Sequence, residues 1–199
     1  LFEEYQSREL AKHVLRPMKE NAPQGFWNGS PVPLGYRAEE VEKRGARIKK
    51  RLVIDPVEAE TIRLIFRLYL HGDGKSGPLG MKEIVKYLNA KGYRTKRNAR
   101  FGVGTLHKIL TNSVYAGKWV FNRRQSKTGR TKPVDEHIAV DVPAIVSREE
   151  FDAVQATLKS RNPRVTPPRV VSGPILLTGL AVCASCHGSM VLRTGTSKS

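Results

Sequence analysis

A capped, amphipathic helix is the feature that most constrains the fold of this chain. Asp55 and Pro56 suit the N-cap and first position of a helix that reaches His71, and Gly72 suits its end. Glu58 follows the cap by three residues and is expected to take part in the capping. Apolar residues recur at helical spacing and predict one buried face: Val57, Ile62, Ile65, Phe66, Tyr69 and Leu70.

Two shorter helices are predicted after this one. The first covers Met81–Lys91 and stops at Gly92, and the second covers 102–111. Two short helices joined by a turn, the second set among basic residues, predict a helix-turn-helix. Four residues would form the apolar side of the second helix: Val103, Leu106, Ile109 and Leu110. Four polar residues would face outward: Thr105, His107, Lys108 and Asn112.

Positive charge is concentrated around the second short helix. Residues 94–132 hold eleven Lys or Arg and no Asp or Glu, in a 199-residue chain of net charge +17. Residues 52–93 are nearly balanced, and residues 133–160 are acidic. Such a run alone is more often a solvated loop. Its concentration beside a short helix favours a nucleic-acid footprint.

The remaining pattern predicts an α+β fold that is mainly helical, with a small β-sheet. Strands are expected near 51–54, at 117–122 and at 136–142, the last two joined by a basic loop that resembles a wing. A helix over 147–160 begins with a capping box of Ser147 and Glu150. The fold class is therefore a helix-turn-helix or winged-helix-like DNA-binding domain, followed by a partial zinc ribbon.

Four segments are predicted. Residues 1–22 form the end of a long helix from a preceding domain, residues 23–160 form the main domain, residues 161–174 form a Pro/Arg-rich linker and residues 175–199 begin a small second unit. Residues 23–37 hold too many prolines and glycines for a helix, but their aromatic residues should dock on the main domain. Packing is favoured over base stacking for five aromatics: Phe26, Trp27, Phe101, Trp119 and Phe121.

No self-sufficient active site is predicted. None of the five histidines lies in a metal or triad pattern, and no phosphate-binding loop is present. No apolar run has transmembrane length, and the first residues do not form a signal peptide. A disulfide framework would use more cysteines at wider spacing, so a reducing, cytoplasmic setting is expected. Neither a membrane partner nor a small-molecule substrate is expected.

Cys183 and Cys186 have the spacing of a zinc knuckle. Two thiolates at this spacing can occupy adjacent corners of a tetrahedral zinc site, and His187 is a sterically awkward third ligand. A redox role lacks its βαβ context. Two buried free thiols are the alternative. Half of a structural zinc site is favoured, with the other ligands beyond Ser199.

The ordered motifs resemble those of large serine recombinases, the integrases of phages and mobile elements. The resemblance covers nearly the whole chain. It rests on Ile54-Asp55-Pro56, Ala59, Ile65-Phe66, Tyr69, Ile84, Leu88-Asn89, Gly92, Ile109-Leu110-Thr111-Asn112, Tyr115-Ala116-Gly117, Ile145-Val146-Ser147, Phe151, Leu158, Leu177-Thr178-Gly179-Leu180 and Cys183-x-x-Cys186. Two residues depart from the family pattern: Phe101 replaces a common Trp, and His187 replaces a common Gly.

The resemblance implies sequence-specific binding to double-stranded DNA as part of a site-specific recombinase that acts as a dimer or tetramer. Residues 23–37 would cross the minor groove, and the helical domain would read the adjacent major groove. The nucleophilic serine would lie in an N-terminal domain absent here, so this chain would not be active alone. Two alternatives remain open: a stand-alone winged-helix transcription regulator and an RNA-binding ribbon protein.

The DNA-contacting residues are predicted in three groups. Base readout is assigned to Arg94, Lys96, Arg97, Arg100, Thr105, His107, Lys108 and Asn112. Phosphate contact is assigned to Arg123, Arg124, Lys127, Arg130 and Lys132. Contact with the backbone or the minor groove is assigned to Arg37, Arg161, Arg164 and Arg169.

Overall fold

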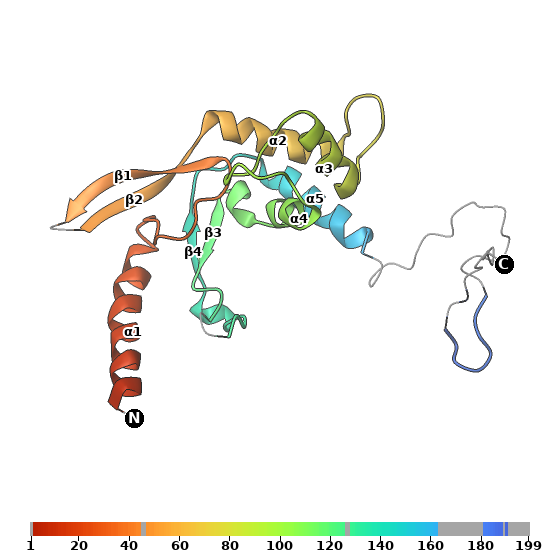
Figure 1. The fold of residues 1–199 in the computed structure, drawn as a ribbon. Helices are drawn as coiled ribbons and strands as arrows, with labels where there is room; N and C mark the ends of the chain where they lie inside the picture. Colours follow the sequence, from red (N-terminus) through yellow and green to blue (C-terminus); the bar gives the residue numbers. More distant parts are fainter. Residues whose placement is uncertain (1, 45–46, 126–127, 163–180, 189, 191–199) are drawn as a thin grey trace. The chain divides into compact units, whose positions relative to one another are not determined.

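The computed structural model describes residues 2–44, 47–125, 128–162, 181–188 and 190 (Figure 1). The predicted long helix is α2, Pro56–Leu70, and the Asp55 carboxylate caps it by accepting the N–H groups of Val57 and Glu58 at 3.1 and 3.2 Å. Two expectations for this helix are wrong. Glu58 contacts Gly35 and Lys96 rather than returning to the cap, and Val57 is 79% exposed. The buried face consists of Ala59, Ile62, Ile65, Phe66, Leu68 and Tyr69.

The two short helices are α3, Met81–Ala90, and α4, Val103–Leu110. The Asn89 side chain joins them, since its Nδ2 donates to the carbonyl of Phe101 and its Oδ1 accepts the N–H of Phe101, both at 2.9 Å. Phe101 is 3% exposed, so its predicted packing role is confirmed. Val103 was expected on the apolar side but is 39% exposed. The buried side of α4 is formed by Leu106, Ile109 and Leu110.

A small sheet follows α4, as predicted. The short helix η1, Ser113–Ala116, leads into β3, Lys118–Phe121, which pairs antiparallel with β4, Ile138–Asp141. The 3-10 helix η2, Val134–Glu136, precedes β4.

Helix α5, Arg148–Ser160, starts with the predicted capping box. The Ser147 hydroxyl accepts the N–H of Glu150 at 3.1 Å, and the Glu150 carboxylate accepts the N–H of Ser147 at 3.0 Å. Phe151 and Val154 are the buried residues of this helix.

A β-hairpin precedes α2 and is longer than the sequence indicated. Strand β1, Tyr36–Arg44, pairs antiparallel with β2, Arg47–Ile54, with a bulge between Glu40 and Glu42. Charged residues fill much of both strands, so the apolar alternation that marks a strand is missing outside 51–54. This sheet and the β3–β4 sheet are separate two-stranded sheets.

The segment before β1 docks on the domain, as its aromatic residues predicted. Phe26 is 6% exposed, and the Trp27 ring lies 4.4 Å from the Trp119 ring between centroids. The buried hydroxyl of Tyr36 lies 2.9 Å from the carbonyl oxygen of Val114 and 2.7 Å from that of Pro143. Burial raises the pKa of Tyr36, which keeps this hydroxyl protonated as a hydrogen-bond donor.

Helix α1, Phe2–Asn21, matches the predicted N-terminal helix. The chain divides into two compact units, Leu1–Gln155 and Ala156–Ser199. The predicted linker and second unit fall largely on residues 163–180 and 191–199, outside the described residues. No helix in the described part is both long and apolar enough to cross a membrane.

Candidate nucleic-acid interface

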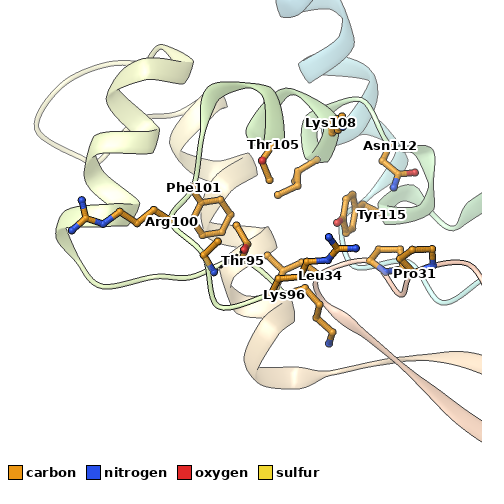
Figure 2. Close-up of a pocket in the computed structure, with 14 residues that line it drawn as sticks. Pro31, Leu34, Thr95, Lys96, Arg100, Phe101, Thr105, Lys108, Asn112 and Tyr115 are labelled. Carbon is orange, nitrogen blue, oxygen red and sulfur yellow. Dashed lines mark hydrogen bonds between the residues drawn. The ribbon is translucent and has the colours of Figure 1, made fainter.

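A groove lies where the segment before β1 meets the residues around α4. Its cavity volume is about 430 Å³, and Figure 2 displays its lining side chains. One wall comes from residues 31–34, another from the 95–101 loop, and a third from α4 and the residues that follow it. This basic groove is lined by Pro31, Pro33, Leu34, Thr95, Lys96, Arg97, Ala99, Arg100, Phe101, Thr105, Lys108, Ile109, Asn112 and Tyr115.

The groove gathers six of the eight residues predicted to read bases. Thr105 and Lys108 are exposed on α4, and Arg97 and Arg100 are exposed on the loop before it. The lining holds four cations and no carboxylate, a composition suited to a polyanion. His107 and Arg94 are exposed outside this lining, and Arg94 donates to the carbonyl of Tyr93 at 2.9 Å.

Two of the gathered residues already serve the fold. The Asn112 side-chain oxygen accepts the N–H of Val114 at 3.2 Å and caps η1, so this half-buried residue has its amide nitrogen to offer a ligand. Lys96 lies 2.5 Å from the carboxylate of Glu58 and 2.9 Å from the carbonyl oxygen of Tyr36. The two residues are therefore less available for base readout than Thr105 and Lys108.

The 95–100 loop is held in one conformation by its own hydrogen bonds. The N–H of Thr95 donates to the carbonyl of Ala99 at 2.9 Å, and the N–H of Asn98 donates to that of Thr95 at 2.8 Å. Asn98 has a φ of +58°, a left-handed conformation that asparagine tolerates better than most residues. The loop thus presents Arg97 and Arg100 from an ordered turn.

The basic loop between β3 and β4 extends their ribbon. The N–H of Lys132 donates to the carbonyl of Arg123, and Arg124 pairs with Thr131 in an antiparallel bridge. Arg123, Arg124 and Arg130 are exposed, as expected for phosphate contacts.

Lys132 differs from the other cations of this loop. Its side chain is 19% exposed and lies 3.0 Å from the Glu136 carboxylate. This hydrogen bond lowers the pKa of Glu136, so the ion pair persists to more acidic pH. Lys132 therefore supports the loop.

The other predicted cations lie away from the groove lining. Arg37 is exposed on β1, 3.9 Å from Glu39, and Arg161 is exposed after α5. Lys127, Arg164 and Arg169 lie outside the described residues. Sequence reasoning missed the wall at Pro31, Pro33 and Leu34, where close proline spacing was the available signal.

Cys183 and Cys186 lie on a tight turn. The N–H of His187 donates to the carbonyl of Cys183, and the N–H of Cys183 donates to the carbonyl of Gly188, both at 2.9 Å. The backbone N–H groups of Cys186 and Ser185 point at the Cys183 sulfur and hold its pKa below the usual range. The thiolate is the form that binds zinc, and the Cys183-x-x-Cys186 spacing suits two corners of a tetrahedral site. The described residues contain no cluster of three or more metal-ligating side chains.

His187 has a φ of +54°, the left-handed region that favours glycine. This conformation accounts for the glycine that the resemblance led us to expect at this position.

Comparison with known proteins finds relatives among both curated proteins and solved structures. A Bacillus subtilis (strain 168) protein, "Putative DNA recombinase", is 30% identical over 159 residues, which cover 71% of this chain and 30% of that protein. A crystal structure of an LSR–DNA complex matches 92% of this chain and 48% of its own, with a TM-score of 0.52 and 19% identity. A structure concerning the Listeria innocua prophage attP site matches 89% of this chain and 63% of its own, with a TM-score of 0.50 and 19% identity.

The chain thus spans about a third of the length of the curated relative, and its α+β fold matches those of the two solved structures. The Recombinase family model matches residues 56–161, more than half of the 199 residues. The chain belongs to the Recombinase family, as its resemblance to large serine recombinases predicted.

Proposed function

We propose that this chain is the DNA-binding part of a large serine recombinase that joins DNA at attachment sites. The basic groove carries the proposal, because four cations and no carboxylate line a surface beside the exposed face of α4. Membership of the Recombinase family favours this function over the stand-alone regulator and the RNA-binding ribbon protein.

In this proposal α3 and α4 act as a helix-turn-helix, with α4 in the major groove of double-stranded DNA. Thr105 and Lys108 would reach base edges, together with Arg97 and Arg100 from the loop. The β3–β4 ribbon would act as a wing whose exposed arginines meet phosphates: Arg123, Arg124 and Arg130.

The whole protein would carry out strand exchange through a serine nucleophile, assembled as a dimer or tetramer. This chain would supply recognition of the site and hold the DNA in place. The described residues offer side chains suited to binding, and the serine chemistry is assigned to another part of the parent protein.

The proposed function predicts a steep dependence of DNA binding on salt. If six to ten phosphates are engaged, affinity falls by about 10³–10⁵-fold between 50 and 200 mM salt, because counterions are released. Fluorescence anisotropy of a labelled mixed-sequence duplex, titrated with the full chain at several salt concentrations, measures this. An affinity that stays constant across the series contradicts the proposal, and tighter binding to an A-form RNA duplex favours the ribbon-protein alternative.

We also propose that Cys183 and Cys186 hold zinc together with two further ligands. Cobalt(II), a spectroscopic substitute for zinc, is expected to give a thiolate-to-metal charge-transfer band with the parent protein, which would supply the two further ligands, because both sulfurs would coordinate it. Cys183→Ser and Cys186→Ser should each remove most of the band. His187→Ala is the matched control and should keep it. A band that survives both cysteine substitutions would contradict this assignment.

A further inference from the structure

Lys96 differs from the other cations of the basic groove. Its ammonium lies 2.5 Å from Glu58 Oε2 and 2.9 Å from the carbonyl oxygen of Tyr36. A lysine has three N–H donors, and two are directed at these two oxygens of the protein itself. The Lys96 side chain is 36% exposed and that of Glu58 is 25% exposed, so water screens the pair less than a fully exposed one.

Glu58 brings three segments together at one oxygen atom. Besides Lys96, its Oε2 accepts the N–H of Gly35 at 3.0 Å. Gly35 also accepts the N–H of Asp55 at 3.0 Å through its carbonyl oxygen, which closes the connection to the start of α2. The contact therefore joins α2, the segment leading into β1 and the 95–100 loop.

Close packing restricts the backbone at Gly35, where the segment leading into β1 meets Glu58. Its φ is +93°, and an added Cβ would lie 2.8 Å from Ile145 Cδ1 and 3.0 Å from Ile62 Cγ1. The backbone N–H that faces Glu58 is thus fixed by close packing. The Glu58 carboxylate on α2 is thereby held in place and in turn holds the Lys96 ammonium. Because Lys96 belongs to the 95–100 loop, this contact also restrains the position of Arg97 and Arg100.

We infer that Lys96 is a positioning residue, and that the Glu58–Lys96 pair sets the relation between two walls of the groove. The inference rests on the proposed DNA-binding function. It replaces the predicted base-reading role of Lys96, because a base edge or a phosphate of DNA would have to compete with the Glu58 carboxylate already in contact. Glu58, although not part of the lining, restrains one of the four groove charges.

The dependence of DNA affinity on salt separates a positioning residue from a contact residue. Each lost phosphate contact lowers the slope of log affinity against log salt concentration by about 0.9 on B-form DNA. We compare Lys96→Met with Arg124→Met, an exposed cation of the β3–β4 loop that is assigned to phosphate contact, on a fluorescein-labelled mixed-sequence duplex. Arg124→Met should reduce the slope by about 0.9. Lys96→Met should leave the slope unchanged and weaken binding several-fold at every salt concentration.

Removing the charge of Glu58 gives a second, independent test. Glu58→Gln frees the Lys96 ammonium to meet a phosphate, so the slope should steepen by up to about 0.9. The double variant Lys96→Met/Glu58→Gln should recover affinity relative to Lys96→Met, because no unpaired carboxylate remains beside the groove.

The outcomes distinguish this inference from the proposed function. A wild-type chain without salt-dependent DNA binding refutes the function itself. A wild-type chain that binds, with Lys96→Met losing as much slope as Arg124→Met, overturns the positioning role alone. If circular dichroism finds Lys96→Met unfolded, Glu58→Gln decides: a steeper slope supports the role, and an equal or shallower slope overturns it.

Discussion

Leu106→Ala is expected to lower the free energy of unfolding by about 2–5 kcal/mol. Leu106 is fully buried on the inner side of α4, where removal of its side chain leaves a cavity that the surrounding core fills only in part. Such a loss is a large share of the stability of a typical domain, about 5–15 kcal/mol. Urea denaturation followed by circular dichroism measures it as a lower midpoint with an unchanged slope.

Lys108→Ala is the matched control on the same helix. Lys108 is exposed, and alanine favours helix, so its free energy of unfolding should stay within about 0.5 kcal/mol of the wild-type value. The same substitution should weaken DNA binding, because the lysine lines the basic groove. Equal midpoints for Leu106→Ala and the wild type would mean that α4 does not pack on the core through this residue.

The contrast between buried Leu106 and exposed Lys108 on α4 could be predicted from the sequence. The outward set of α4 and its three buried residues follow from helical spacing, and the caps at Asp55 and Ser147 follow from local side-chain chemistry. The predicted burial of Val57 and Val103 was wrong. Both lie in the first turn of their helices, where the apolar spacing continues in the sequence but no other part of the protein covers the side chain.

The β1–β2 hairpin was underestimated for a different reason. Glu40 lies opposite Lys50 and Glu42 lies opposite Lys49 across the two strands, and Lys50 forms an ion pair with Glu40 at 3.2 Å. Cross-strand pairs of opposite charge support a sheet, yet along the sequence they give no apolar alternation.

The groove could be predicted only in part because its walls are distant in sequence. The basic run identified Arg97, Arg100 and the outward face of α4. The contact of Lys96 with Glu58 spans 38 residues, and the wall at Pro31 and Leu34 lies more than 60 residues before the loop it faces. Nothing local in the sequence shows that Lys96 is paired with Glu58 whereas its neighbour Arg97 is exposed in the groove lining.

Arg97→Ala and Arg100→Ala are each expected to cost about 1–3 kcal/mol of binding to the preferred DNA site, if these side chains read bases. That loss corresponds to about 5–150-fold in affinity, since every 1.4 kcal/mol is tenfold. Both arginines are exposed on the ordered turn before α4 and line the groove. Their guanidinium groups suit bidentate recognition of guanine in the major groove.

The measurement compares two duplexes, one selected for tight binding from a random pool and one of mixed sequence. A base-reading arginine should lose more affinity on the selected site than on the mixed one. Arg67→Ala is the control for net charge, because Arg67 is exposed on α2 and is not part of the groove lining. It should leave both affinities nearly unchanged.

Equal losses on the two duplexes, with a salt slope lower by about 0.9, would assign that arginine to phosphate contact instead. Losses no larger than that of Arg67→Ala would mean that the groove does not face DNA. The two arginines can differ, because Arg97 is next to the fixed Lys96 whereas Arg100 precedes Phe101, whose backbone is tied to Asn89. A base-reading role for either one requires that its loss be specific to the selected site.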